Sequence, residues 1–457
     1  MTATLPVSLT APPIEQVAPH VVVRVKDANL NAAKVALLGA GAVLVAASVA
    51  MTFGEQGTRA AFGYLTAYVA VLGIGLCALL FVMVHHVTRA GWSVGVRRLA
   101  ENLAATLPLM LVLWVPILFK FDQLFTWVSA ELVEGRPGYD HVLAGKHGWL
   151  NKPFFLTRVV VYFAVWIGLT VFFRRASLAQ DRTGDPALSL RMSRVAAPGI
   201  LLFALSITFA AFDWIMSLAP HWFSTIFGVC YFAGSYMAFF AFVILLSQWL
   251  GAKGYLREAI NTEHYHDLAK LMFTFMVFWT YVNFSQYMLI TYANLPEETE
   301  FFRMRLDGGW GAVGTLLVFG HFFVPFAFLM SRHIKRNPVT LAVGAVLMLV
   351  IHWVDMQFLV LPNFEHAGHG AGAETAEHAV EHAAPQGAAA AADANTLFGH
   401  FGDNLATWFS GLHWFDVTSY LGMLCLLAGT TIAVLARHNL LPTRDPRLVE
   451  SLQFHNQ

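Results

Sequence analysis

Long apolar segments, separated by short polar ones, dominate the pattern along this chain of 457 residues. A bilayer core about 30 Å thick is crossed by a helix of roughly 20 apolar residues. Ten segments of suitable length are present, and they predict an all-α polytopic membrane protein. They cover residues 34–53, 60–84, 95–119, 153–173, 194–217, 222–249, 268–292, 310–331, 339–361 and 413–436.

Lysine and arginine are distributed unequally between the two sides that these helices define. If the N-terminal tail, residues 1–33, lies in the cytoplasm, 20 of the 28 basic residues fall in or beside cytoplasmic segments. Cytoplasmic loops of membrane proteins carry an excess of such residues. We therefore expect this tail and the C-terminal tail, residues 437–457, to lie in the cytoplasm.

Two long connections lie on the opposite side of the predicted membrane. Residues 120–152 mix aromatic, charged and Gly-Pro turn residues, which predicts a folded cap with a short amphipathic helix. Residues 362–412 contain no lysine or arginine, and their middle is rich in Ala, Gly, Glu and His. Because such a composition buries little apolar surface, we expect a partly disordered, solvated loop rather than a metal site.

A weak internal repeat relates the two halves of the membrane domain, residues 34–361. Asp213 is followed seven residues later by Pro220, and Asp355 is followed seven residues later by Pro362. Both pairs lie at the outer ends of helices that run in the same direction, the fifth and the ninth. This predicts two parallel four-helix bundles, helices two to five and six to nine. Helices one and ten are then peripheral.

The composition excludes several classes of protein. Hydrophobic residues make up 57% and charged residues 12% of the chain, whereas soluble domains carry roughly 25% charged residues. Basic and acidic residues number 28 each, so there is no positive excess for binding nucleic acid. The three cysteines, Cys77, Cys230 and Cys425, are isolated in apolar runs and form no haem c, iron–sulfur or zinc motif. We therefore expect no metal site and no cofactor on this chain.

A few ionisable residues interrupt the apolar segments. A charge at the bilayer centre costs about 2.5 to 3.5 kcal/mol, so such residues are candidates for function. His352 and Asp355 are three residues apart, which places them on one helix face within hydrogen-bonding reach. Asp213 lies about one turn inside the outer end of its helix. These residues predict a proton relay, with a polar pair that only fixes helix packing as the alternative.

His321 lies in the run GHFFVP, and Pro325 follows it by one turn. Proline removes a backbone hydrogen bond and frees a carbonyl in the preceding turn. His321 and His352 lie at similar depths on consecutive helices, so the pair could also ligate a haem b. A single pair of histidines beside an aspartate favours a proton relay or plain packing over haem.

The seventh predicted helix begins with the polar run NTEHYHDLAK, which contains Asp267 and Lys270. Polar residues continue inward with Thr274, Asn283 and Gln286. Such a series predicts a ladder for water and protons from the cytoplasm. Interhelical hydrogen bonds that only join helices are the alternative.

Three further ionisable residues lie near the predicted cytoplasmic surface, namely His85, His86 and Glu101. Long or amphipathic side chains at this depth can extend to the interface. We therefore expect them to be structural.

The stretch FAAFDWIMSLAPHWFSTIFGVCYFAG, residues 209–234, lies within the ten-helix plan and contains an Asp-x6-Pro-x-Trp run from Asp213 to Trp222. The stretch and the plan together resemble the NrfD and polysulfide-reductase-type membrane subunits of bacterial alternative complex III, a quinol:electron-acceptor oxidoreductase. The Asp-x6-Pro-x-Trp run is the most specific part of this resemblance. In that complex two related ten-helix subunits occur side by side with iron–sulfur and haem c subunits. The resemblance implies a bacterial cytoplasmic membrane, quinol as the substrate of the complex, and redox groups on the partner subunits.

The chain resembles the companion of the quinol-site subunit. In the quinol-site subunit a histidine precedes the equivalent of Asp213 by about two turns. Here the stretch reads ALSITFAAFD, residues 204–213, and contains no histidine. The run HWVDMQ, residues 352–357, resembles what a proton-conducting partner needs.

The expected function is therefore an integral subunit of a quinol-oxidising complex that transfers electrons to a cytochrome c, with a proton half-channel in this chain. A secondary transporter is the alternative from another class, since polar residues at mid-depth and repeats also describe transporters. Pro325 in the eighth helix has no matching break in the fourth, which disfavours transport. A purely structural membrane anchor is the third possibility.

Overall fold

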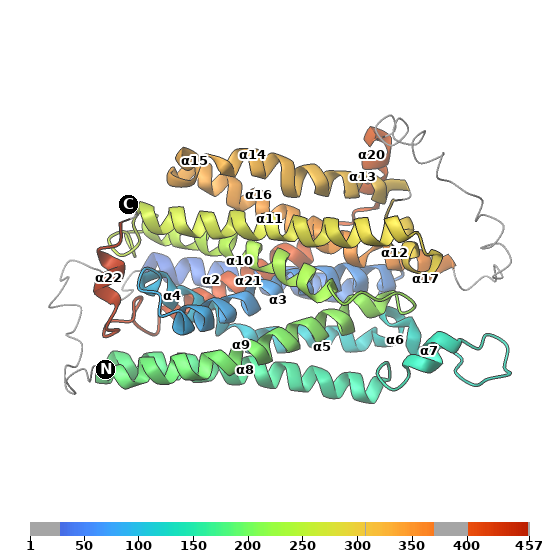
Figure 1. Ribbon diagram of the computed structural model, residues 1–457, viewed down its shortest axis with the longest axis horizontal. Coiled ribbons are helices and arrows are strands. Elements are labelled where there is room, and N and C mark those ends of the chain that lie inside the picture. Colours follow the sequence, from blue (N-terminus) through green and yellow to red (C-terminus); the bar gives the residue numbers. More distant parts are fainter. Residues whose placement is uncertain (1–27, 307, 370–400, 456–457) are drawn as a thin grey trace.

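Long helices that run side by side along one axis form the protein (Figure 1). The structure, a computed structural model, describes residues 28–306, 308–369 and 401–455. In these ranges the chain is helical apart from its connections, and one isolated β-bridge joins Glu131 to Tyr139. The structure therefore confirms an all-α polytopic membrane protein.

Nine helical stretches of the described ranges are long and apolar enough to cross a membrane. They are α2 (Ala28–Met51), α3 (Gly57–Val87), α4 (Val94–Ala104) with α5 (Leu107–Phe119), α8 (Lys152–Thr183), α9 (Pro186–Trp214) with η2 (Met216–Leu218), α10 (Phe227–Ala252), α13 (Gly308–Leu317) with η3 (Val318–Phe323) and α14 (Val324–Met330), α16 (Pro338–Val360) with α17 (Pro362–His369), and α21 (Trp414–Leu435). The seventh predicted helix corresponds to α11 (Thr262–Ala293), which is 32 residues long. Polar residues such as Asn283 and Gln286 interrupt its inner part, so α11 is not among the nine sufficiently apolar stretches.

The short elements lie at the two ends of the bundle (Figure 1). One end, here called the cap end, carries α6 (Phe121–Leu124), η1 (Thr126–Ser129), α7 (His141–Lys146), α12 (Pro296–Leu306) and α20 (Phe401–Gly411). The other, here called the tail end, carries α15 (Arg332–Arg336) and α22 (Leu448–Leu452). The loop expected over residues 362–412 is helical at both edges, and residues 370–400, where disorder was expected, lie outside the described residues.

Polar side chains fix where several of the long helices begin. The side chains of Asn151, Asp185, Asn261 and Asn337 accept hydrogen bonds from backbone N–H groups at the starts of α8, α9, α11 and α16. Such caps satisfy donors that a helix cannot pair internally. At the other end of α8, Gly184 adopts a left-handed conformation with φ of +68°.

Two predicted helices are interrupted. The helix expected at 95–119 divides into α4 and α5 near Thr106, and Pro108 stands at the start of α5. The helix expected at 310–331 contains η3, a π-helical segment, just before Pro325. Proline lacks the backbone N–H that would continue the regular ladder, which explains both positions. The helix α8, in contrast, is continuous over 32 residues.

The helices α3 and α10 form the centre of the bundle and contact each other. Nearly all side chains of α3 are buried, whereas α2 is largely exposed and packs along α21. This arrangement places α3 and α10 between the remaining helices, so polar groups that face them are shielded from lipid.

Close packing of α2 on α21 depends on glycine. A Cβ added at Gly422 would lie 2.9 Å from Leu44 Cβ and 3.1 Å from Val45 N. We expect Gly422→Leu to separate the two helices and to destabilise the protein by about 1 to 3 kcal/mol. Thermal unfolding in detergent measures this, with Gly39→Leu as the control because nothing lies within 4 Å of a Cβ there. Equal melting temperatures for both variants would contradict the packing described.

Candidate functional site

Asp355 on α16 is a carboxylate in the interior of the bundle. It is 3% exposed, and among the described residues no cation lies within ion-pair distance. Its Oδ2 accepts one hydrogen bond, from Trp279 Nε1 of α11, at 3.0 Å. A buried carboxylate with a single neutral donor is typical of a functional group rather than of a structural ion pair.

Gly234 on α10 provides the space in which the neighbouring groups meet. A Cβ at this position would lie 3.2 Å from Trp279 Cδ1 and 3.4 Å from both Asp355 Oδ2 and His352 Nδ1. His352 is fully buried, and its Nε2 lies 3.3 Å from the carbonyl oxygen of Ala70. Because a carbonyl only accepts, Nε2 donates, and Nδ1 is left as an acceptor that no other described residue contacts with a hydrogen bond.

His321 joins the same group from the π-helical segment η3. It is fully buried, and its ring stacks on the indole of Trp279 with centroids 3.6 Å apart and planes 18° apart. Neither ring nitrogen has a hydrogen-bond partner among the described residues. Since π-helical segments are frequent at functional sites, the irregular backbone here supports a functional role. We call Trp279, His321, His352 and Asp355 the Trp279 cluster.

Other polar atoms of α10 and α16 are buried as well. Ser235 Oγ on α10 and both side-chain polar atoms of Gln357 on α16 lack hydrogen-bond partners among the described residues. Proteins bind internal water where buried polar atoms lack protein partners. In the Trp279 cluster itself, the unpartnered Nδ1 of His352 faces Gly234 together with Asp355 Oδ2, so water bound there would join an imidazole to a carboxylate, as proton transfer requires.

The hydrogen bond expected between His352 and Asp355 does not form. Both side chains face Gly234, but the carboxylate accepts from Trp279 and the imidazole donates to the carbonyl of Ala70 instead of bonding to each other. The prediction that the two groups share one helix face was correct, but the prediction of a direct pair was wrong.

Asp213 at the end of α9 has a different environment. It is fully buried, and its carboxylate accepts two hydrogen bonds from Arg158, from Nε at 2.7 Å and from Nη2 at 2.8 Å. Trp149 Nε1 and Tyr162 OH donate to it as well, at 3.0 and 2.7 Å. A carboxylate held by four donors, two of them on one guanidinium, is typical of a structural clamp. Its proposed part in a proton relay stays a prediction.

The polar residues of α11 do not form one continuous buried row. Lys270 and Thr274 are exposed, and Lys270 forms an ion pair with Asp267. Gln286 is buried and accepts from Cys230 Sγ at 3.4 Å, while Asn283 donates to the backbone of its own helix at Trp279. The buried face between the tail end and Trp279 is instead apolar, because Leu268, Ala269, Met272 and Met276 occupy it. The continuous ladder expected from the sequence is therefore absent from this described helix.

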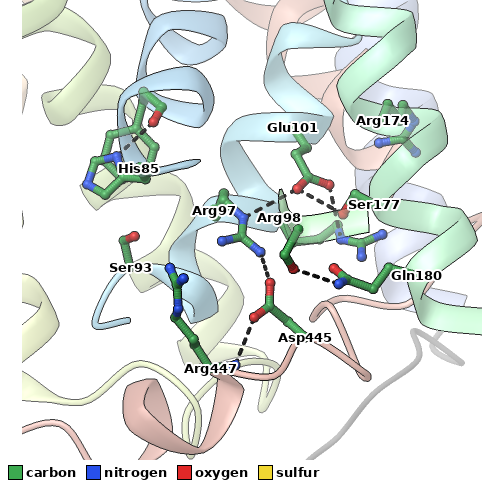
Figure 2. Close-up of polar contacts among 12 residues, drawn as sticks. His85, Ser93, Arg97, Arg98, Glu101, Arg174, Ser177, Gln180, Asp445 and Arg447 are labelled. Atoms are coloured by element: carbon green, nitrogen blue, oxygen red, sulfur yellow. Dashed lines mark hydrogen bonds and ion pairs between the residues drawn. The ribbon is translucent and has the colours of Figure 1, made fainter. Parts of the chain in front are cut away.

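A second buried polar group lies at the tail end (Figure 2). Arg97 Nη2 donates to Asp445 Oδ2, and Arg98 Nη2 donates to Asp181 Oδ2 at 2.8 Å. The Nε atoms of Arg97 and Arg98 lie 3.7 and 3.3 Å from Glu101. We call these five residues the tail-end cluster; it joins α4 to α8 and to the C-terminal segment.

His85, His86 and Glu101 were expected to reach the interface, and this expectation was wrong. Their exposed fractions are 6%, 5% and 2%. The C-terminal segment folds back over this end of the bundle, where Asp445, Leu448 and Ser451 are buried against it, and so covers these side chains.

Sequence analysis missed three residues that surround Asp213 or Asp355 in the structure. Arg158 is a lone arginine in the fourth apolar segment, which is a usable signal for a buried counter-ion. Trp279 and Gly234 carry no comparable signal, because tryptophan and glycine are common in membrane helices.

The described residues contain no group of three or more His, Cys, Asp or Glu side chains placed to hold a metal ion. The chain matches no protein-family model and no curated protein.

Proposed function

We propose that this chain is a membrane subunit of a bacterial quinol:electron-acceptor oxidoreductase, and that the Trp279 cluster belongs to a proton half-channel. The observation that carries the proposal is the convergence of Asp355 and His352 on Gly234, with His321 stacked on the indole of Trp279. Quinol oxidation releases protons together with electrons, so a complex of this kind needs groups that hold and move protons. The resemblance of residues 209–234 supplies the class of complex.

Redox groups and partners follow from the same proposal. Quinol is the substrate of the complex, and haem c and iron–sulfur clusters reside on partner subunits that pass electrons to a cytochrome c. A homologous ten-helix subunit lies beside this chain and holds the quinol pocket. Electron transfer then occurs in the partners, while this chain provides proton-carrying side chains.

The half-channel opens toward the cap end. Asp355 lies five residues before the last residue of α16, Val360, which corresponds to roughly 7 to 8 Å along the helix axis. Beyond α16, a cleft of about 560 Å³ is lined by His221, Glu300 and Asn363 among others. Within the described part of the chain, the Oδ1 atom of Asn363 is buried without a partner, so it can bind water at the inner wall of this cleft.

The proposed arrangement in the membrane has ten crossing helices, with α11 as the seventh. The helices α3 to α9 and α10 to α16 form the two four-helix bundles, and α2 with α21 lies at their periphery. The tail end faces the bacterial cytoplasm, because 20 of the 28 lysines and arginines belong to the segments on that side.

Native purification tests the class of complex. A tagged chain is expected to co-purify with a homologous ten-helix subunit, a haem c subunit and an iron–sulfur subunit, identified by mass spectrometry and by the haem absorption spectrum. Isolation as a lone protein that transports a substrate in proteoliposomes would contradict the proposal and favour a secondary transporter.

The structure disfavours the transporter for a specific reason. Transporters built from repeats have broken helices at corresponding places in both halves. The π-helical break at η3 has no counterpart in α8, which is continuous from Lys152 to Thr183. A purely structural anchor is the remaining alternative, and mutation of Asp355 distinguishes it.

A further inference from the structure

Arg305 on α12 is a fully buried arginine without a carboxylate partner. None of the ion pairs formed by the described residues includes it. Its Nε donates to the carbonyl oxygen of Phe358 at 2.9 Å, and its Nη2 donates to that of Leu359 at 2.8 Å. Its Nη1 donates to the carbonyl oxygen of Phe301 at 2.8 Å, and its Cζ lies 3.5 Å from the centre of the Phe301 ring. Two of its three donor nitrogens are therefore bound to the end of α16.

Pro362 explains why the end of α16 accepts donors from a side chain. In a regular helix the carbonyl of Phe358 would accept from the backbone N–H four residues later, which is position 362. Proline has no N–H, so α16 ends just before it and α17 begins there. Arg305 supplies the missing donor, and Asn363 Nδ2 adds a second donor to the carbonyl of Leu359. Side chains of α12 and α17 thus close α16 at the cap end (Figure 1).

An arginine precedes the aspartate in both halves of the weak internal repeat. In the first half, Arg158 precedes Asp213 by 55 residues and donates to its carboxylate through two nitrogens. In the second half, Arg305 precedes Asp355 by 50 residues, but its donors are taken by backbone carbonyls. Asp355 is left with Trp279 as its donor. The same two residue types therefore give a clamp in one half and, within the described residues, a carboxylate without an ion pair in the other.

Arg305 connects the surroundings of Asp355 to the cap-end cleft. Leu359, whose carbonyl it binds, follows Asp355 by one helical turn, a rise of about 6 Å. Its neighbours Phe301 and Met304 on α12 line the cleft of about 560 Å³. Carbonyls at a helix end that lose their donors leave the last turn free to fray. The hold of Arg305 on α16 therefore bears directly on the turn that follows Asp355.

We propose that Arg305 is a positioning residue for Asp355. It holds the last turn of α16 and so keeps the carboxylate on Trp279, on the side of the bundle that leads to the cap-end cleft. The fixed fork of a guanidinium suits this task, because several N–H donors reach neighbouring carbonyls at once. A lysine has one compact ammonium and cannot reproduce the fork. The expected effect on turnover rests on the proposed function, whereas the hold on α16 is tested without it.

Hydrogen–deuterium exchange of the intact complex tests the hold on α16. In Arg305→Met we expect the amides of the last turn of α16, residues 355–361, to exchange at least about tenfold faster than in wild type. Arg303, an exposed arginine on the same helix, gives the matched control, and Arg303→Met is expected to exchange as wild type. If Arg305→Met fails to assemble, Arg305→Lys keeps the buried charge and is expected to speed exchange in the same direction by a smaller factor.

Turnover in H2O and in D2O separates positioning from a loss of stability. Arg305→Met is expected to slow quinol oxidation and to raise the ratio of the rate in H2O to the rate in D2O, because proton transfer through a displaced Asp355 becomes limiting. A smaller amount of folded complex lowers the rate but leaves this ratio unchanged. Arg305→Lys is expected to restore the ratio in part, and Arg303→Met is expected to have the ratio of wild type.

Two results would overturn the proposal. One is wild-type exchange at the end of α16 in Arg305→Met. The other is faster exchange combined with the turnover and isotope ratio of wild type, in a complex in which Asp355→Asn is slow. Wild-type turnover of Asp355→Asn would instead refute the proposed function, and faster exchange in Arg305→Met would then still support the hold on α16.

Discussion

Asp355→Asn is expected to slow quinol oxidation by the intact complex at least about tenfold, because it removes a group that takes up and releases protons. Asparagine keeps the size and hydrogen-bonding capacity of aspartate, so the contact with Trp279 Nε1 can persist. We therefore expect assembly and thermal stability to change little. Steady-state turnover of the purified complex, together with its subunit composition, measures both effects.

Two further variants make this result specific. His352→Ala removes the imidazole that faces Gly234 and is expected to slow turnover in the same direction. Asp122→Asn changes an exposed carboxylate at the cap end, whose side chain is 63% exposed, and is expected to leave turnover unchanged. Wild-type turnover in both Asp355→Asn and His352→Ala would show that these side chains serve packing, and the structural anchor would then be the better account.

Asp213→Ala is expected to destabilise the protein more than Asp355→Asn does. The substitution leaves Arg158 buried without its counter-ion, and breaking such a pair from one side costs about 3 to 5 kcal/mol. Tyr162 and Trp149 lose their acceptor at the same time. We expect low yields of assembled protein and a clearly lower melting temperature in detergent.

The matched control for this variant is Asp122→Ala. Asp122 pairs with Lys152 at 2.6 Å on the exposed surface of the same end of α8. Exposed pairs contribute about 0 to 1 kcal/mol, so this variant is expected to melt close to wild type. If Asp213→Ala is as stable as Asp122→Ala but loses turnover, Asp213 belongs to the proton path rather than to a clamp.

The membrane helices were predictable from the sequence because lipid imposes one simple requirement. A spanning helix needs an apolar run of sufficient length, and this can be counted. The interruption at Thr106 was not predicted, because neither Thr106 nor Pro108 makes the segment less apolar on average. Pro325 did indicate a disturbed backbone, and the π-helical segment η3 lies immediately before it.

The candidate site was predictable only in part. Buried charge in membrane helices is rare, so Asp213, His321, His352 and Asp355 could be identified as candidates without a structure. Their partners could not. Asp213 pairs with Arg158, which is 55 residues away in the chain, and Asp355 bonds to a tryptophan 76 residues away.

The tail-end cluster shows a second limit of sequence analysis. Glu101 lies near a predicted interface, where a charged side chain usually extends into water. It is buried because arginines of α4 surround it and the C-terminal segment, through Asp445, closes this end of the bundle. No local pattern around Glu101 reveals a cover that comes from more than 300 residues further along the chain.

Proton release by the complex in sealed liposomes is the most direct test of the central claim, that the Trp279 cluster conducts protons for quinol oxidation. A pH-sensitive dye outside the liposomes is followed during turnover, and the number of protons per electron is compared between wild type and Asp355→Asn. We predict that Asp355→Asn lowers this ratio as well as the rate. The same ratio and the same rate in wild type and Asp355→Asn would contradict the claim.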